Sequence, residues 1–264
     1  MSMVEKGVEL QRVKSGIPGL DALMSGGFVK GNSILICGAP GTGKTLVGLQ
    51  FLYRGAKDYG EPGLYACIEE DPHKLIAYAK SFGWDLDDLI RRKMFDFVSI
   101  PIDYHGFNIM EAIEEKARRI KAQRMVVDSL SALNFNARMF DLPLENQPDP
   151  TGTIDRKRVM KVAGYAPFED AHQFTYLIIE RIEEFGATTM FITDSPQDSS
   201  ALTKDGVSEF VCDGVVHLQL HDTSENVSRT LTVKKMRGGP IVPGMKSLKF
   251  QKDGVEVGDY KVFY

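Results

Sequence analysis

The sequence predicts an α/β protein with a mainly parallel sheet, helices on both faces of that sheet, and antiparallel strands at its C-terminal end. Three observations predict this fold. A glycine-rich loop joins a strand-like run to a helical run between residues 33 and 56. Apolar runs and amphipathic helical patterns then alternate up to residue 193, which is typical of parallel strands joined by helices. Beyond residue 214 the chain changes to alternating strands joined by polar turns, which pair antiparallel.

The first strand and helix flank the segment Gly38-Ala39-Pro40-Gly41-Thr42-Gly43-Lys44-Thr45, which fits the pattern G-x-x-x-x-G-K-[ST]. Residues 33–37 form an apolar run that is typical of a buried parallel strand. Residues 46–56 carry apolar side chains at helical spacing. A strand, a glycine loop and a helix in this order are the context of a phosphate-binding loop, or P-loop.

The backbone N–H groups of such a loop and the positive end of the following helix favour phosphate at the same place. We expect Lys44 to contact the outer phosphates and the Thr45 hydroxyl to bind Mg²⁺. The sequence therefore predicts a nucleoside triphosphate site. Its expected nucleotide-binding residues are Pro40, Gly41, Thr42, Gly43, Lys44, Thr45 and Leu46.

The remaining elements follow in chain order. We expect strands at residues 64–68, 95–100, 124–128 and 188–193, and helices at 72–82, 109–122 and 168–185. Asp71 before Pro72 is typical of a helix N-cap. In the tail, strands at 214–220 and 229–235 form a hairpin, and strands at 247–250 and 255–257 flank a turn. Because no change in composition marks a boundary, residues 1–264 are expected to form a single domain.

Composition narrows the classes of function. Of the 264 residues, 43% are hydrophobic and 26% are charged, as in ordinary soluble domains. No apolar run is long enough to span a bilayer, and the start lacks the apolar core of a signal peptide, so we expect a cytoplasmic protein without a membrane partner. A net charge of −4 argues against obligatory nucleic-acid binding. Cys37, Cys67 and Cys212 lie in apolar runs and are expected to be buried free thiols.

Three carboxylates follow strands that are expected to end beside the P-loop. Asp128 ends the strand at 124–128, where it would hold the water shell of the metal, unless it only caps a turn with Ser129. Glu69 and Glu70 follow the strand at 64–68. One of them can orient and deprotonate the attacking water, or the pair forms a solvated acidic turn.

Two cations, Lys235 and Arg237, end the second strand of the predicted hairpin. Because negative charge develops on the γ-phosphoryl group during its transfer, cations placed there lower the barrier. The pair could project from one subunit toward the nucleotide of another. The alternative is a basic strand end on the surface.

Residues 136–167 do not fit the pattern. This stretch holds several prolines and glycines, with acidic residues followed by a basic patch, and it is long for a loop within a compact domain. We interpret it as an insertion: a lid, a surface for a protein partner, or a solvated segment without a role.

These motifs together resemble the KaiC family. Beyond the P-loop, the resemblance lies in Ser15 to Asp21, Glu69-Glu70, Ser81-Phe82-Gly83-Trp84, Arg124 to Leu130, Glu209 to Gly214 and Lys235-Met236-Arg237-Gly238. They occur in the family's order from about residue 13 to residue 258. The chain is similar to the single-domain KaiC-like ATPases that are common in archaea. That resemblance implies a RecA-like core of the RecA and RadA superfamily, and ATP or ADP with Mg²⁺ as ligands.

The resemblance also implies roles for residues and an assembly. The family forms hexameric rings with ATP between neighbouring subunits. Glu69 and Glu70 match its paired catalytic glutamates, and Ser81 matches a serine near the nucleotide. Lys235 and Arg237 match a lysine and an arginine that reach across the interface.

The sequence departs from the family at several places. The family often continues its Lys-x-Arg-Gly motif with Thr or Ser and then a His, whereas this chain reads Gly239-Pro240-Ile241, so that contact is lost or replaced. The strand at 188–193 ends with Asp194 where a Glu is usual, and the 136–167 stretch is longer than expected. Ser208 occupies the slot of an autophosphorylated pair in clock proteins, which suggests weak autokinase activity as a hypothesis.

Three functions fit these features. The first is a Mg²⁺-dependent ATPase that works as a homo-oligomeric, hexameric ring. The second is a recombinase-like paralogue that binds single-stranded DNA through Arg156-Lys157-Arg158 and Lys161. The third is a signalling scaffold whose partner exchange is timed by ATP turnover and whose docking surface is the 136–167 insertion.

Overall fold

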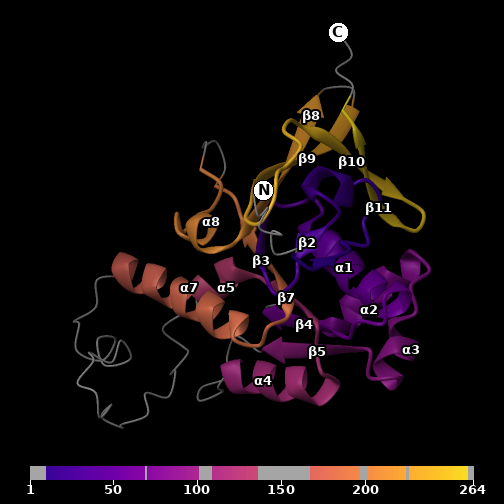
Figure 1. The fold of residues 1–264 in the computed structure, drawn as a ribbon, viewed down its shortest axis with the longest axis vertical. Helices are drawn as coiled ribbons and strands as arrows, with labels where there is room; N and C mark the ends of the chain where they lie inside the picture. Colours follow the sequence, from indigo (N-terminus) through magenta and orange to yellow (C-terminus); the bar gives the residue numbers. More distant parts are fainter. Residues whose placement is uncertain are drawn as a thin grey trace, which may run out of the picture.

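The computed structural model describes residues 10–68, 70–100, 109–135, 167–196, 201–223 and 226–260. Within these ranges nine strands form one sheet in the order β11-β10-β9-β8-β3-β7-β6-β4-β5 (Figure 1). The parallel strands are β3 (Ser33–Gly38), β4 (Gly63–Ile68), β5 (Phe95–Ile100), β6 (Arg124–Asp128), β7 (Thr188–Asp194) and β8 (Gly214–Thr223). The antiparallel extension consists of β9 (Asn226–Met236), β10 (Lys246–Gln251) and β11 (Gly254–Asp259). The predicted α/β architecture is confirmed.

Helices cover both faces of the sheet because successive strand residues point to opposite sides. Ile34 and Ile36 pack with α1 (Lys44–Asp58), α2 (Pro72–Ser81) and α3 (Leu86–Arg91). Leu35 and Cys37 pack on the other face, with α4 (Ile109–Ile120), α5 (Leu130–Phe135) and α7 (Pro167–Glu183). Figure 1 shows the two groups of helices on either side of the sheet.

Helix α1 is more deeply enclosed than its sequence pattern predicts. Besides apolar residues at helical spacing such as Leu49, Leu52 and Tyr53, the side chain of Gln50 is buried. The Gln50 amide donates to the carbonyls of Gly16 and Val255 at 3.0 Å each, and its oxygen accepts from the N–H of Val255 at 2.6 Å. These bonds join the helix behind the P-loop to β11, which begins near the C-terminal end of the described chain.

A buried guanidinium fixes the start of β6 to the same helix. Arg124 is fully buried; its Nε donates to Glu61 at 2.6 Å and its Nη1 to the carbonyl of Phe51 at 2.9 Å. The guanidinium carbon lies 4.6 Å from the centre of the Phe51 ring. Burial lowers the pKa of Arg124, while Glu61 opposes this shift. Gly55 of α1 makes room for this side chain, since a Cβ there would lie 2.4 Å from its Cδ.

Several short elements are not predicted by the sequence. They are α3, α5, α8 (Ser208–Val211), the 3-10 helix η1 (Asp21–Met24), and a two-stranded sheet of β1 (Arg12–Val13) and β2 (Phe28–Val29). Each is too short to establish a hydrophobic period. A capping signal does mark α3, where the Asp85 carboxylate accepts from the N–H of Asp88 at 2.9 Å.

The described residues include the three cysteines and the helices named above, but only the last residue of the predicted insertion. Cys37, Cys67 and Cys212 are free and buried, as predicted. In the described part of the chain, no helix combines the length and the apolar character that a membrane span requires. The predicted 136–167 insertion lies outside the described residues, except for Pro167 at the start of α7.

Candidate nucleotide-binding site

The carboxyl ends of the central parallel strands meet at one edge of the sheet, and the predicted site residues lie there. Gly38 at the end of β3 pairs with Asp194 at the end of β7, and Asp128 at the end of β6 pairs with Cys67 of β4. This register brings the P-loop, Asp128 and the residues after β4 to the same edge. Open α/β sheets bind their ligands at such an edge.

The P-loop presents backbone N–H groups at this edge. Gly41 and Gly43 have φ angles of 79° and 101°, which glycine adopts without a steric penalty. Gly43 is the N-cap of α1, and no side chain caps that helix end. The first N–H groups of α1 are therefore left for an anion, which the helix dipole also favours.

Lys44 is the first residue of α1, and its ammonium group is held by three acceptors. Nζ donates to the carbonyls of Gly38 at 2.8 Å and Ala39 at 3.1 Å, and it pairs with Asp194 at 3.1 Å. Asp194 also lies 3.5 Å from Lys204. The sequence shows Asp194 only as a departure from the family, and the register of β3 and β7 explains its contact with the P-loop lysine.

Thr45 and Asp128 form a cluster of oxygen atoms beside Lys44. The Thr45 hydroxyl donates to Asp128 at 2.9 Å, and the Tyr65 hydroxyl donates to the same carboxylate oxygen at 2.6 Å. Hard oxygen atoms of this kind suit Mg²⁺, which binds through one or two protein ligands, substrate phosphates and water. The two residues predicted to hold the metal therefore lie together, and their donor chemistry fits Mg²⁺.

Asp128 has a perturbed pKa with a clear cause. Burial raises its pKa, and the hydrogen bonds from Tyr65 and Thr45 together with the Lys44 charge oppose the shift. A carboxyl group whose pKa is raised in the folded state binds protons more readily than it does when unfolded. The free energy of unfolding of the metal-free protein should therefore fall as pH rises through the raised pKa.

This shift predicts a pH limit for metal-assisted nucleotide binding. Because Mg²⁺ requires the ionised carboxylate, the extra stabilisation that Mg·ADP gives over ADP with a chelator should fade on acidification. On lowering the pH, this extra stabilisation should begin to decrease while the pH is still above about 3.9, the usual pKa of an Asp side chain. Melting temperatures with Mg·ADP, and with ADP and a chelator, measured from neutral pH down to about pH 4, check the prediction. Asp128→Asn should lose the Mg²⁺-dependent increment at every pH, whereas an increment in the wild type that is constant down to about pH 4 would contradict the prediction.

Of the two glutamates predicted to activate water, the structure describes only Glu70. Glu69 lies outside the described residues, and Glu70 is half-buried directly after it. Burial raises the pKa of Tyr65 well above its usual value, and the charges of Asp128, Cys67 and Glu70 add to the shift. Glu70 is therefore close enough to act on the Tyr65–Asp128 cluster electrostatically.

Ser81 lies in the last turn of α2, and the structure gives its hydroxyl a local partner. The side chain is exposed, and Oγ donates to the carbonyl of Tyr78 at 2.7 Å. Its predicted role near the nucleotide stays a prediction.

Arg229 and Phe250 also contact the P-loop, and sequence reasoning does not identify them. Nε of Arg229 donates to the carbonyl of Gly41 at 3.1 Å, and its guanidinium carbon lies 4.5 Å from the centre of the Phe250 ring. That ring packs on Gly43, where a Cβ would lie 2.7 Å from its Cζ. The only signal available from the sequence is a cation in an alternating strand, because this contact depends on how β8, β9 and β10 extend the sheet from β3.

Lys235 and Arg237 lie near the opposite edge of the sheet from the P-loop of their own chain. Lys235 pairs with Val215, which pairs with Leu35 inside β3, and the N–H of Arg237 donates to Asp213 just before β8. Along the direction of the strands, Arg237 therefore lies beside the start of β3. Gly38, at the other end of β3, is five residues or about 16 Å further along the strand.

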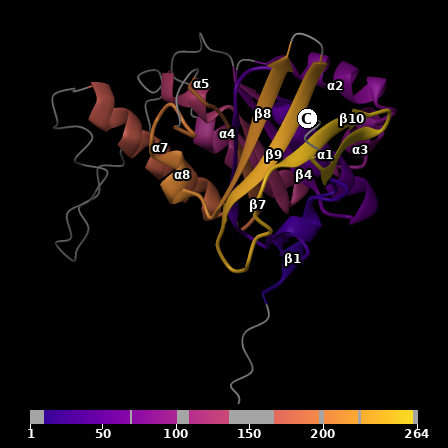
Figure 2. The same ribbon diagram turned by 90° about the horizontal axis from the view of Figure 1, so that it is seen from above.

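Both cations are held by residues at the end of α8. Nζ of Lys235 donates to the carbonyls of Glu209 at 3.1 Å, Phe210 at 3.0 Å and Cys212 at 2.6 Å. Arg237 donates to the Phe210 carbonyl at 3.2 Å and pairs with Asp213 at 3.2 Å, but its side chain is still 56% exposed. Figure 2 shows α8 next to α7, on the opposite side of β8 and β9 from α1.

Ser208, the candidate for autophosphorylation, is fully buried at the start of α8. Its hydroxyl donates to the Asp205 carboxylate, which also accepts the N–H of Ser208 at 2.9 Å. The hydroxyl is thus buried and bonded within the turn that precedes α8. The structure therefore gives the autokinase hypothesis no support.

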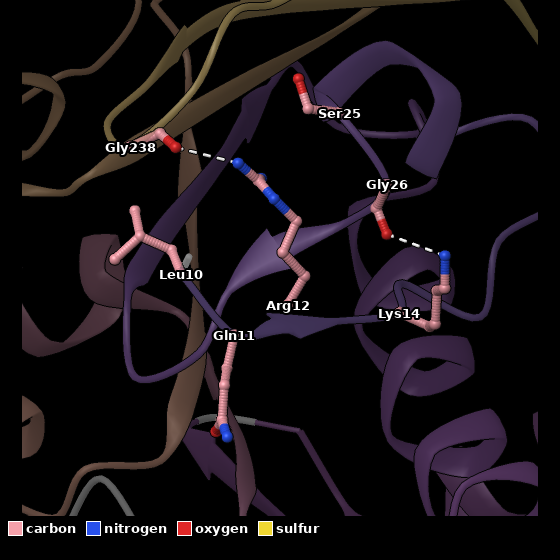
Figure 3. A pocket seen from close by; sticks show the side chains of 7 residues that line it. All are labelled: Leu10, Gln11, Arg12, Lys14, Ser25, Gly26 and Gly238. Carbon is pink, nitrogen blue, oxygen red and sulfur yellow. Dashed lines mark hydrogen bonds between the residues drawn. The ribbon is translucent and has the colours of Figure 1, made fainter. Parts of the chain in front are cut away.

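A cavity of about 830 Å³ lies beside Gly238, the residue that follows Arg237 in the chain (Figure 3). Its lining is formed by Leu10, Gln11, Arg12, Lys14, Ser25, Gly26 and Gly238. Arg12 points toward the Lys235–Gly238 strand end and donates to the carbonyl of Gly238 at 2.9 Å. A Cβ on Gly239 would lie 2.6 Å from Nη2 of Arg12. Arg12 thus fills the space of the side chain that is missing at position 239.

Comparisons with known proteins agree with this geometry. The family model described as "ATPase: KaiC" matches residues 13–140 and 157–262. The circadian clock oscillator protein KaiC of Parathermosynechococcus lividus is 29% identical over 94% of this chain and 42% of its own length. KaiC of Prochlorococcus marinus subsp. pastoris is 30% identical over 95% of this chain and 45% of its own length. The chain thus spans less than half the length of these two relatives.

A solved structure has the same fold over nearly its whole length. The crystal structure of the KaiC-like protein PH0186 from the hyperthermophilic archaeon Pyrococcus horikoshii OT3 superposes with a TM-score of 0.75. It is 29% identical, and the match covers 94% of this chain and 99% of that one. With its P-loop at the carboxyl edge of a RecA-like sheet, and with a family match over most of its length, the chain belongs to the KaiC family of ATPases, a family of ATP-binding domains.

Proposed function

We propose that this protein is a Mg²⁺-dependent ATPase that acts as a homo-oligomeric ring, with six subunits as the expected number, and that each ATP lies between two neighbouring subunits. The observation that carries the proposal is the separation of the P-loop from Lys235 and Arg237. Arg237 is level with the start of β3, and both cations are bonded to residues at the end of α8 and not to the P-loop. We therefore expect them to act on the nucleotide of an adjoining copy and not on that of their own chain.

One half of the site comes from the subunit that binds ATP. Residues 41–46 supply backbone N–H groups for the phosphates, and Lys44 adds a positive charge. Arg229, which is fixed to the carbonyl of Gly41 and the ring of Phe250, lies at the mouth of the loop as a second cation. Thr45 and Asp128 would hold Mg²⁺, which when bound neutralises phosphate charge and orients the phosphates for in-line attack.

The water that attacks the γ-phosphate requires a base or an orienting group. Glu70, and Glu69 beside it in the chain, follow β4 at the edge where the phosphates are expected. A carboxylate there accepts the proton as the O–P bond forms. We expect one of the two carboxylates to orient the water and the other to support it.

The other half of the site comes from the neighbouring subunit. Lys235 and Arg237 would approach the γ-phosphoryl group, where negative charge accumulates in the transition state. The exposure of Arg237 supports this role, because its side chain can exchange its present bonds to α8 for phosphate oxygens.

A comparison of glutamine variants tests the proposal. Glu70→Gln or Glu69→Gln, whichever removes the base, should lower the rate of phosphate release by about 10²- to 10⁴-fold and leave ATP binding nearly unchanged. Glu115→Gln, on the exposed face of α4, is the matched control and should keep the wild-type rate. A wild-type protein that neither binds Mg·ATP nor releases phosphate would refute the proposal.

The assembly is tested by native mass measurements with and without Mg·ATP. Ring-sized particles that form or persist with the nucleotide support the proposal, and a monomer under both conditions contradicts it. The DNA-binding and scaffold alternatives depend on residues 136–167, including Arg156-Lys157-Arg158 and Lys161, which lie outside the described ranges except for Pro167. ATP hydrolysis is therefore the function that the described geometry supports best.

A further inference from the structure

The ammonium group of Lys44 has no free donor in this structure. An ammonium carries three N–H donors, and Nζ of Lys44 already faces the carbonyls of Gly38 and Ala39 and the carboxylate of Asp194. A phosphate oxygen that binds Lys44 must therefore displace one of these three acceptors. Asp194 is the acceptor that a phosphate repels, because both are negatively charged.

Asp194 already has a second cationic partner. Its other oxygen lies 3.5 Å from Nζ of Lys204, whose side chain is 58% exposed. Next to it, the N–H of Ser195 donates to the carbonyl of Gly38 at 3.2 Å, and its hydroxyl donates to the carbonyl of Leu202 at 2.7 Å. The end of β7 is thus bonded to the P-loop on one side and to residues 202–204 on the other.

The segment of residues 201–213 is internally bonded and is expected to move as a unit. Thr203 donates to Asp205 at 3.1 Å and to Glu209, and its hydroxyl accepts the N–H of Gly206 at 3.0 Å. Asp205 accepts the N–H groups of Val207 and Ser208 at 2.8 and 2.9 Å. A displacement at its start therefore reaches α8.

The far end of the same segment holds the two cations that the proposed function assigns to the neighbour's ATP. Carbonyls of Glu209, Phe210 and Cys212 bind Lys235, and the Phe210 carbonyl and Asp213 bind Arg237. A continuous series of hydrogen bonds and ion pairs therefore runs from Lys44 to these cations within one subunit.

We propose that Asp194 and Ser195 are positioning residues that couple phosphate binding at the P-loop to the placement of Lys235 and Arg237 for the adjoining ATP site. This inference rests on the proposed function. When a phosphate oxygen binds Lys44, Asp194 loses that partner and pairs more closely with Lys204. This contact holds the 201–213 segment in place, and the segment in turn positions Lys235 and Arg237. Occupancy of one site would then tune hydrolysis at the next.

Hydrogen–deuterium exchange of the whole protein tests the coupling, with Mg·AMP-PNP as the probe because its outer phosphates reach Lys44. Exchange in peptides from 201–213 should slow by about fivefold, the lower end of common coupling strengths. The double variant Ser195→Ala/Lys204→Met should lose this slowing while its AMP-PNP affinity stays within about twofold of wild type. Lys121→Met, an exposed lysine at the end of α4, should behave as the wild type. AMP, which lacks the outer phosphates, should cause no slowing.

The outcomes separate the inference from the proposed function. If AMP-PNP binds but the 201–213 peptides of the wild type do not change, the coupling is absent and the ATPase proposal stands. If the double variant keeps the full slowing, the protection comes from contact with another subunit and the inference is overturned. If the wild type does not bind AMP-PNP at all, the proposed function and the inference both fail.

Discussion

Arg237→Ala is expected to slow ATP hydrolysis by about 10³-fold, at the lower end of the range for arginine residues that stabilise phosphoryl transfer. ATP affinity should change by less than about fivefold, because the P-loop of the other subunit provides most of the binding. The reason is that Arg237 lies about 16 Å from the level of its own P-loop, so that in the proposed ring it would act on a neighbour's γ-phosphate. Single-turnover phosphate release and nucleotide titration measure the two quantities separately.

Mixing two inactive variants is the control for action between subunits. Lys44→Ala subunits lack the P-loop cation but still offer Arg237, and Arg237→Ala subunits have the reverse defect. Mixed assemblies should regain part of the activity, since some interfaces then combine an intact P-loop with an intact Arg237. No recovery on mixing would contradict action across an interface. Equal losses of rate and affinity in Arg237→Ala would assign Arg237 to ground-state binding.

Gly55→Ala is expected to destabilise the fold by about 3–5 kcal/mol, although helix propensity alone predicts a gain of about 1 kcal/mol. The new Cβ would lie 2.4 Å from both Cδ and Nε of Arg124, so the guanidinium must move. Arg124 is fully buried, and moving it breaks its bonds to Glu61 and Phe51. A buried charge that loses its partner costs about this much. Urea unfolding of the variant and the wild type gives the difference in free energy.

A second variant shows whether the collision is the cause. In an Arg124→Ala background the side chain at position 124 ends at Cβ, so the atoms that crowd Gly55 are absent and adding Gly55→Ala should cost much less than it does in the wild type. The difference between the two costs is the interaction energy of the pair. Equal costs in both backgrounds would mean that Arg124 is not the residue that opposes the methyl group.

The sequence predicts the central part of the fold because several local signals agree there. The strand before Gly38, the glycine loop and the apolar spacing of α1 each favour the same arrangement. Boundaries shift by small amounts: α1 begins at Lys44 and not at Leu46, because the last P-loop residues already adopt helical geometry. Short elements such as α3 and α8 are missed, since one or two turns carry no measurable period.

In the candidate site too, local features can be predicted from the sequence and long-range contacts cannot. The P-loop and Asp128 are predictable because each follows directly on a strand that the sequence identifies. The contacts of Arg229 and Phe250 with the P-loop depend on the pairing of β8, β9 and β10, which no local pattern specifies. The bonds from α8 to Lys235 and Arg237 are likewise long-range, and the roles of Glu69, Glu70 and Ser81 stay predictions.

The guanidinium that occupies the space beside Gly239 has a consequence for the redesign of this protein. A threonine introduced at position 239 would place a Cβ 2.6 Å from Nη2 of Arg12. Because Nη2 is the end of a flexible side chain, Arg12 can move aside, but it would then lose its hydrogen bond to the Gly238 carbonyl. A threonine at position 239 is therefore expected to be tolerated with the loss of that bond, and a smaller residue at position 12 would remove the conflict altogether.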